Sequence, residues 1–394
     1  MSEHTHDLLE AAKALAPETV ELRRELHANP EIGLHLPGTQ QRILDALTGL
    51  GLDITLGESL SSVVADLDTG KEGPTVLLRG DMDALPLTED TDLPFKSTVE
   101  GRMHACGHDT HVAMLVGAAK LLSDNKSEFN GKVRFMFQPG EEGYHGAKFM
   151  IEEGVVDGVD RAFAIHVDSN TPLGIIGSRP GAMAASSDEL EITVRGRGGH
   201  ASMPHVAADP IAAAAGITTG LYTMVTRDID AFDPAMVTVA SIHGGTAGNI
   251  IPETAELVGT IRAVSEETRE TVHDMITRVA QGIASAHGCT ADVNIIKGYP
   301  VTINDAAMVK VVENAAATVL GEGRYLDAPT PIMGSEDFSY VLQRVPGAMM
   351  GLGLCPDGYD NPYAAPSLHS NRAMLNEAGL PVGVAMHAAV AMAR

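Results

Sequence analysis

The apolar residues of the chain fall into short runs that alternate with segments of helical periodicity. Residues 74–80 are almost continuously apolar, as expected for a strand buried on both faces of a sheet. Further strands are predicted at 63–67, 132–138, 162–167 and 347–354. Helices are predicted at 7–28 with a break at Pro17, and at 39–50, 109–122, 306–320 and 379–392. This alternation is typical of an α/β domain whose mostly parallel sheet is flanked by helices.

The pattern changes between residues 187 and 297. Strands are predicted at 188–198, 236–245, 253–264 and 289–298, and helices at 209–226 and 266–287. The resulting order β-α-β-β-α-β is that of the ferredoxin-like α+β unit. We therefore expect 187–297 to be an inserted domain, and 1–186 and 298–394 to be the two parts of the larger one.

Composition narrows the possible partners. Acidic residues outnumber basic ones by 52 to 27, which gives the 394-residue chain a formal net charge of -25. Nucleic acids and anionic membrane surfaces attract basic proteins, so we expect neither as a partner. No apolar run reaches the roughly 18 residues of a membrane span. The three cysteines are odd in number and far apart, and the N-terminal segment lacks a signal-peptide pattern, so we expect a cytoplasmic protein.

Candidate metal chemistry is concentrated at residues 103–111, MHACGHDTH, which hold one Cys, three His and one Asp. Thiolate and imidazole are donors for borderline-soft divalent ions. Gly107 separates Cys106 from His108, and its conformational freedom would let a loop turn both side chains toward one point. The alternative is a polar turn before a helix, in which Asp109 caps that helix. His27 lies in a turn rich in Pro and Gly, where a catalytic role is one interpretation and a surface residue is the prediction we favour.

Other polar residues follow the ends of predicted strands. Asp81, Asp83, Glu141, Glu142 and His166 all occupy such positions. The carboxyl ends of parallel strands share one edge of a sheet, where ligands bind in α/β folds, so we expect these groups to meet there. One carboxylate of the Glu pair could bind metal while the other takes a proton from water. A solvated acidic turn and a sheet-end His are the alternatives for each motif taken alone.

Three further residues lie in loops. His369 stands in the Pro-rich segment 361–370, where metal binding would give the loop a reason to be ordered, and a surface His is the alternative. His200 follows a Gly pair, and Asn249 lies in GGTAGNIIP, both within the inserted domain. At loop tips, these two could donate hydrogen bonds to a developing oxyanion or be ordinary loop residues.

Taken together, the motifs resemble one known family. The set RGDMDALP, MHACGHDTH, QPGEEG, AIHV, GRGGHASMPH, GGTAGNIIP, MGSEDF and PSLHS is similar to the amidohydrolase branch of the zinc-aminoacylase and carboxypeptidase superfamily. That branch includes hippurate hydrolases, N-acyl-amino-acid amidohydrolases and plant auxin-conjugate hydrolases. The resemblance implies an α/β catalytic domain around two divalent metal ions, with a ferredoxin-like lid domain that forms a homodimer.

The resemblance also implies roles for single residues. Glu141 would be the general base and Asp83 a carboxylate that orients a ligand. His200 would stabilise the oxyanion in the partner subunit's site, and Asn249 would contact substrate. The implied metal ligands are Cys106, His108, Glu142, His166 and His369. A thiolate ligand favours zinc, while manganese, cobalt or nickel could replace it, and the division of ligands between the ions stays open.

The expected activity is hydrolysis of the amide bond of an N-acyl amino acid to a carboxylic acid and a free amino acid. A dipeptidase or carboxypeptidase with the same site is the nearer alternative. A metal- or ligand-binding module without turnover and a structural or interaction protein are the more distant ones. The chain departs from the family at Tyr144 and His145, where small Gly residues are common. We expect these two side chains to narrow the substrate pocket or make it more polar.

Overall fold

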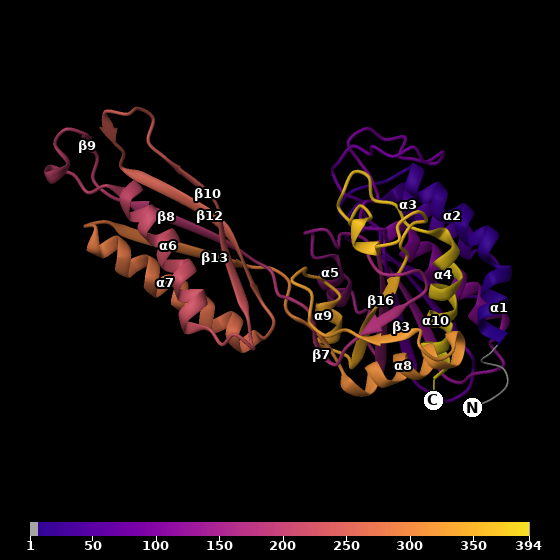
Figure 1. The fold of residues 1–394 in the computed structure, drawn as a ribbon. Helices are drawn as coiled ribbons and strands as arrows, with labels where there is room; N and C mark the ends of the chain where they lie inside the picture. The colour runs from indigo at the N-terminus through magenta and orange to yellow at the C-terminus, as the bar shows by residue number, and fades with distance from the viewer. Residues whose placement is uncertain (1–6, 394) are drawn as a thin grey trace. The chain divides into compact units, whose positions relative to one another are not determined.

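The structure is a computed structural model that describes residues 7–393, and its contacts divide the chain into two compact units (Figure 1). The second unit comprises Ala184–Thr302 and Pro331–Glu336, and the first comprises the other described residues. The predicted inserted domain, 187–297, lies inside the second unit. Among the helices of the described residues, none combines the length and apolar character that crossing a bilayer requires.

The elements of the first unit are short and closely spaced along the chain. Its helices are α1 (Asp7–Ala14), α2 (Ala16–Ala28), α3 (Pro37–Leu47), α4 (His108–Asp124), α5 (Gly146–Glu152), α8 (Ala306–Leu320), α9 (Ser339–Leu342) and α10 (Leu380–Met392). Its strands are β1 (Asp53–Leu56), β2 (Val63–Asp68), β3 (Thr75–Asp81), β4 (Lys132–Gln138), β5 (Arg161–Asp168), β6 (Ile176–Ser178), β15 (Tyr325–Asp327) and β16 (Gly347–Gly353). Two 3-10 turns, η3 (Pro362–Ala364) and η4 (Glu377–Gly379), precede α10, while β7 (Gly181–Ala184) and β14 (Thr302–Asn304) include the residues at the boundary between the units.

These strands form an eight-stranded sheet within the described residues, in the order β1-β2-β4-β3-β5-β16-β6-β15. The central pairs β4-β3, β3-β5 and β5-β16 are parallel, and antiparallel pairs occur toward the edges. The predicted mostly parallel sheet is therefore confirmed. In the register of β3 and β4, Asp81 lies beside Gln138, so the segments that follow both strands leave from the same edge.

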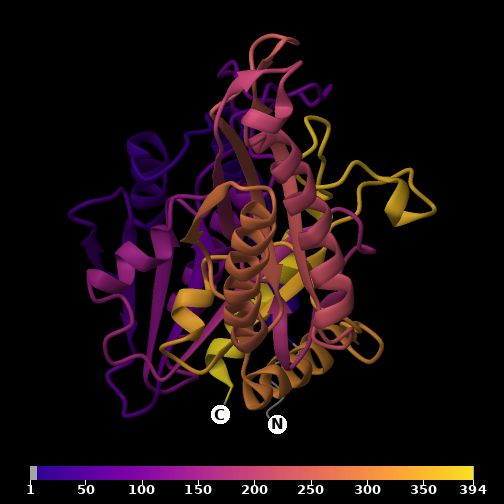
Figure 2. The ribbon, with the colours of Figure 1, turned by 90° about the vertical axis from the view of Figure 1, so that its left-hand side faces the viewer.

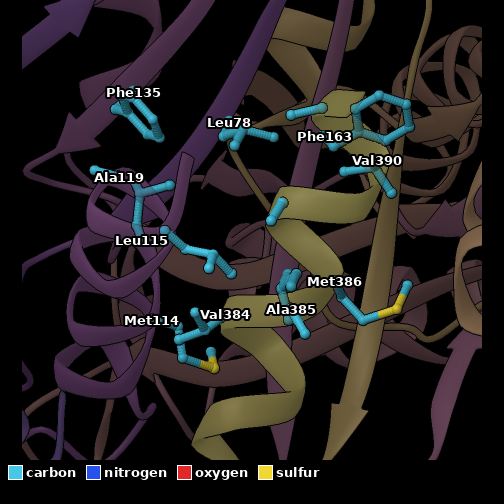
Figure 3. Packing of buried hydrophobic residues seen from close by; sticks show 14 of the residues in the cluster. Leu78, Met114, Leu115, Ala119, Phe135, Phe163, Val384, Ala385, Met386 and Val390 are labelled. Carbon is cyan, nitrogen blue, oxygen red and sulfur yellow. The ribbon is translucent and has the colours of Figure 1, made fainter. Parts of the chain in front are cut away.

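Helices cover both faces of the sheet, because neighbouring residues of each central strand point to opposite sides. Leu78 and Phe135 belong to a core packed against α4 and α10, as Figure 3 shows, whereas Leu77 and Met136 pack toward α5 and α9. The sequence predicts that only one face of α4 is buried, but the buried part of this helix is larger. Nearly all its residues from His108 to Leu122 are buried, because α10 and α2 cover the sides that the sheet does not.

The second unit has the predicted ferredoxin-like element order. It contains β8 (Asp188–Arg195), α6 (Pro210–Asp228), β10 (Ala235–Gly244), β12 (Thr254–Ala263), α7 (Glu266–Ala286) and β13 (Thr290–Lys297), with the short β9 (Gly199–His200), η2 (Pro204–Val206) and β11 (Ile250–Ile251) between them. The four long strands form an antiparallel sheet in the order β10-β12-β8-β13. Helices α6 and α7 lie side by side and share an apolar core with that sheet (Figure 2).

Candidate metal centre

The backbone at Gly107 turns Cys106 and His108 toward one region. Gly107 has a left-handed conformation, with φ of 84°, directly before the first residue of α4. A side chain there would meet Val167 and Leu375, since an added Cβ would lie 2.6 and 2.7 Å from their methyl groups. Glycine is therefore required at this position for both conformation and space.

Donor atoms from distant segments meet at this turn. The Cys106 Sγ lies 3.6 Å from His166 Nε2 and 3.3 Å from His369 Nε2. His369 Nε2 also lies 3.3 Å from Glu142 Oε1. Three overlapping groups each have ligand atoms within 4.8 Å of one another. These groups are Cys106, His108 and His166; Cys106, Glu142 and His369; and His108, Glu141 and Glu142.

Backbone carbonyls fix the orientation of two imidazoles. The Nδ1 of His108 donates to the Asp83 carbonyl at 2.8 Å, and the Nδ1 of His166 donates to the Val167 carbonyl at 2.8 Å. In the neutral form of each ring, Nε2 is therefore the atom that carries the lone pair. The His108 Nε2 is buried and has no hydrogen-bond partner among the described residues. A buried nitrogen lone pair without a donor is costly unless a cation accepts it.

Asp83 holds the Glu141–Glu142 turn in place. Its carboxylate accepts the backbone N–H of Glu141 at 2.9 Å and that of Glu142 at 3.1 Å. Asp83 and Glu141 are both buried, and Asp83 Oδ1 also lies 3.5 Å from His108 Nδ1. One aspartate thus positions both glutamates, while its own carbonyl orients an imidazole.

The electrostatics of the cluster favour anionic donors. Burial raises the pKa of the Cys106 thiol, but the nearby His108 and His166 rings outweigh it and bring that pKa to about 6. Hydrogen bonds to Cys106 and Glu142 raise the pKa of His369 to about 10. Burial raises the pKa of Glu142, but His369 and His108 lower it below its usual value. A thiolate and a carboxylate held close together attract cations.

The donor set suits divalent ions of the zinc type. Ligand atoms at about 2.0–2.3 Å from one tetrahedral ion lie about 3.3–3.8 Å from one another, which is the range of the Cys106–His166 and Cys106–His369 separations. His369 also has a φ of 66°, a left-handed conformation that is strained for a residue other than glycine. Such strain is maintained where the surrounding structure requires it, most often at functional sites.

His111, in the 103–111 motif, and Asp81, at the end of β3, are occupied by other partners. His111 uses both ring nitrogens, because Nδ1 pairs with Asp81 and Nε2 accepts the Val167 N–H at 2.9 Å. Burial lowers the pKa of His111 to about 4, so the ring is neutral. Asp81 is buried and also pairs with Arg79, which neutralises its charge. The alternative of a simple polar turn does not describe this segment, because most of it is buried.

Two predictions about nearby residues are wrong. Asp109 makes no capping hydrogen bond at the start of α4, because its carboxylate instead binds Arg23 Nε and His27 Nδ1, each at 2.8 Å. His27 is not a surface residue, since its exposed fraction is 1% and it lies in the last turn of α2. An ion-pair partner 82 residues away in sequence leaves no local signal for either residue.

The Tyr144–His145 segment is held by contacts of its own. The Tyr144 ring lies against Gly33, where an added Cβ would be 3.3 Å from it, and the side chain is 44% exposed. The His145 Nδ1 lies 3.1 Å from the Tyr340 hydroxyl, and the residue has a φ of 59°. Their effect on the substrate pocket stays a prediction.

The second unit brings His200 and Asn249 together. His200 pairs with Ile250 in the β9–β11 ladder, and the Ala201 N–H donates to the Asn249 carbonyl at 3.0 Å. The backbone N–H of Ser202 donates to His200 Nδ1 at 3.1 Å, which leaves the proton of the neutral ring on Nε2. Both side chains are exposed, so this loop pair presents hydrogen-bond donors at the surface of its unit.

Clustered metal donors beside a buried carboxylate at the edge of a parallel sheet define a metal-dependent hydrolase. The chain belongs to peptidase family M20/M25/M40, whose family model matches residues 77–393. This membership confirms the superfamily recognised from the motifs.

Relatives cover almost the whole chain. It is 39% identical over 381 residues to thermostable carboxypeptidase 2 of Saccharolobus solfataricus, which is 95% of this chain and 94% of that protein. It is 39% identical to IAA-amino acid hydrolase ILR1-like 2 of Arabidopsis thaliana, over 98% of this chain and 87% of the relative. N-acetylcysteine deacetylase of Bacillus subtilis is 38% identical, over 87% of this chain and 90% of the relative.

A solved structure shares the fold. The Bacillus subtilis YXEP protein, described as a dinuclear metal binding peptidase of the M20 family, superposes with a TM-score of 0.85 and 34% sequence identity. The match covers 96% of this chain and 98% of that protein.

Proposed function

We propose that this protein hydrolyses the amide bond of N-acyl amino acids, using two divalent metal ions. One observation carries the proposal. Donor atoms from four separate segments gather in overlapping groups beside the buried Glu141. The proposed ligands are Cys106, His108, Glu142, His166 and His369. Two ions are supported by these overlapping groups and by the dinuclear M20 neighbour. The thiolate favours zinc, and manganese, cobalt or nickel are the other candidates.

Each residue then has a defined task. Divalent ions bound here would polarise the substrate carbonyl and lower the pKa of water toward about 7. Glu141 takes the proton of the attacking water and later gives it to the leaving amine, because its carboxylate lies within 4.8 Å of His108 and Glu142 donors. Asp83 keeps Glu141 and Glu142 in this arrangement through their backbone N–H groups.

The lid residues complete the proposal. His200 donates its Nε2–H to the oxyanion of the partner subunit's substrate, in a homodimer formed through the second unit, and Asn249 binds substrate beside it. The Ser202 N–H on Nδ1 supports this role, since it selects the tautomer that donates from Nε2. We also propose a cytoplasmic location, which the three free cysteines support.

The substrate class follows from the relatives. The names IAA-amino acid hydrolase and N-acetylcysteine deacetylase both describe cleavage between an acyl group and an amino acid. The name carboxypeptidase favours a second candidate, cleavage of a C-terminal residue from a peptide by the same groups. Both reactions release a free amino acid, and they differ in whether the substrate carries a free amine.

The test is a panel of N-acyl amino acids and free-amine dipeptides, assayed with the metal-reconstituted enzyme and with Glu141→Gln. We expect turnover of the N-acyl substrates, and a loss of about 10²–10⁴-fold in kcat for the variant with metal content unchanged. Glu128→Gln, at an exposed position, is the matched control. Turnover of dipeptides alone would favour the carboxypeptidase candidate. Full activity of Glu141→Gln would show that Glu141 is not the general base. Metal binding without turnover of any substrate would indicate a binding module.

A further inference from the structure

His27 is a buried imidazole that faces two carboxylates. Its Nδ1 lies 2.8 Å from Asp109 Oδ2, and its Nε2 lies 3.3 Å from Glu89 Oε1. The side chains of His27 and Glu89 are each 2% exposed, and that of Asp109 is fully buried. None of these residues belongs to the proposed ligand set, and the proposed hydrolysis uses none of them.

The contacts determine the protonation of this ring. Ionised carboxylates only accept hydrogen bonds, so a ring that pairs with one through each nitrogen must carry both protons. Asp109 also binds the Arg23 guanidinium at 2.8 Å. Burial raises the pKa of Glu89, but the hydrogen bonds that Glu89 accepts from His27, Ser97 and Thr91 lower this pKa overall. Both acids are therefore charged, and His27 is an imidazolium held between them.

Glu89 belongs to a long loop, residues 85–103, which we call the strap. Glu89 Oε2 accepts the Ser97 N–H at 2.7 Å, which closes the strap on itself. The Thr98 N–H donates to the Ala28 carbonyl at 2.9 Å, next to His27. His27 and its neighbour thus bind the strap at two points.

The strap also contacts the loop that carries His369. The Asp90 N–H donates to the Asn371 carbonyl at 2.8 Å, and the Arg372 guanidinium binds the Asp90 carboxylate at 2.6 and 2.8 Å. A continuous series of contacts therefore runs from Asp109, next to His108, through His27, Glu89 and Asp90 to Asn371, two residues beyond His369. The series therefore begins beside one proposed ligand, His108, and ends beside another, His369, which is 261 residues further along the chain (369 minus 108).

We propose that His27 is a positioning residue: as an imidazolium it joins the strap to α4 and thereby sets the separation of His108 and His369. The assignment rests on the proposed ligand roles of those two histidines. A charged ring is needed because a neutral imidazole can donate to only one of the two carboxylates, and its other nitrogen would then face a buried carboxylate oxygen with a lone pair in place of a proton. Such a loss would release the strap and loosen the His369 loop.

The proposal has a defined pH dependence. The groups that face His27 are Asp109 on α4, Glu89 on the strap, Arg23 on α2 and the His104 ring before α4. Burial lowers the pKa of His27, but Asp109 and Glu89 raise it above its usual value in sum, and Arg23 acts against them. The link is therefore complete at low pH and is lost as the pH rises through that raised pKa.

The first experiment observes His27 directly. Histidine-selective ¹³C and ¹⁵N labelling, with the His27 signal assigned from its absence in His27→Gln, reports the ring's protonation as a function of pH. We expect an imidazolium at pH 7 that titrates above the usual histidine range. Glu89→Gln removes one anion, so it should shift this titration to lower pH. A neutral His27 ring at pH 7 would overturn the proposal.

The second experiment separates charge from packing. We expect His27→Gln to weaken metal binding by about 10-fold in calorimetric titration with Zn²⁺, and to increase amide hydrogen exchange in residues 85–103. Adding Glu89→Gln to His27→Gln removes the carboxylate charge that has lost its imidazolium partner. The double variant should therefore recover both the Zn²⁺ affinity and the protection of residues 85–103 from exchange. His35→Gln, at an exposed position in the same unit, is the control.

The outcomes are distinct. If Glu89→Gln restores neither metal affinity nor strap protection, or if His27→Gln binds Zn²⁺ like wild type, the positioning role is refuted. If the wild-type protein binds no metal, the proposed function fails. In that case the titration of His27 and the strap's exchange still decide whether the imidazolium holds the strap.

Discussion

Replacing Asp83 tests how the turn at Glu141 and Glu142 is held. Asp83 is 1% exposed and is the acceptor for both backbone N–H groups of that turn, at 2.9 and 3.1 Å. In Asp83→Ala these two N–H groups lose their acceptor inside the protein. In Asp83→Asn one of them faces an amide that donates rather than accepts.

The expected magnitude follows from the contacts. A hydrogen bond to a charged acceptor contributes about 1.5–3 kcal/mol, so two such bonds give about 3–6 kcal/mol as an upper limit for Asp83→Ala. Relaxation of the turn toward solvent would reduce this loss and move both glutamates. Metal affinity should then fall by about 10–100-fold, as is usual when a group that orients a ligand is removed.

The assay combines urea unfolding of the metal-free protein with calorimetric titration of Zn²⁺. The matched control is Asp292→Asn, which removes one partner of the exposed Arg195–Asp292 ion pair and should change stability by no more than about 1 kcal/mol. Asp83→Ala should lose both stability and metal affinity, and Asp83→Asn should lose less of each. If Asp83→Ala matched wild type in both, the turn would not depend on Asp83, and our account of Glu141 would fail.

Two further predictions concern the second unit and the substrate pocket. Burial raises the pKa of Asp188, but hydrogen bonds from His273 and Arg269 lower it overall, so its stabilising effect is complete above about pH 4 and is lost as the pH falls through the lowered pKa. In Asp188→Asn, the free energy of unfolding should therefore fall less steeply as the pH is lowered below about 4. The same steepness as in the wild-type protein would contradict this. Replacing Tyr144 and His145 together by Gly should change the preference among acyl groups on a substrate panel, whereas an identical preference would exclude both from the pocket.

The features predicted correctly from the sequence are those with a local signal. The continuous apolar run of β3 and the β-α-β-β-α-β order of the second unit are visible in short windows, and both are present in the structure. The turn at Gly107 is also predictable from the sequence, because few residues other than glycine tolerate a φ of 84°. Short elements such as β6 and β15 carry too few residues for a periodic pattern, and no strand was predicted there.

What could not be predicted depends on pairing between distant residues. Asp109 occupies a position at which a cap is common, yet Arg23 offers it a charged partner and the cap is not formed. His27 stands in a turn-like sequence, but Asp109 and Glu89 draw it into the interior. In both cases a buried ion pair outweighs the local preference, because an unpaired buried charge costs more than a missing cap.

The same pairing separates the proposed metal donors from other acidic side chains nearby. Arg79 neutralises Asp81, and Arg23 with His27 neutralises Asp109, so these acids have no unpaired charge to offer a metal. The groups that lower the pKa of Cys106 and Glu142 are histidine rings and not guanidinium groups, and one of them, His369, is 55% exposed and reaches the cluster from a strained loop. Two anionic donors held within 4.8 Å of each other repel, so the cluster gains most from binding a multiply charged cation. The buried cations thus confine the attraction for metal to the groups around Cys106.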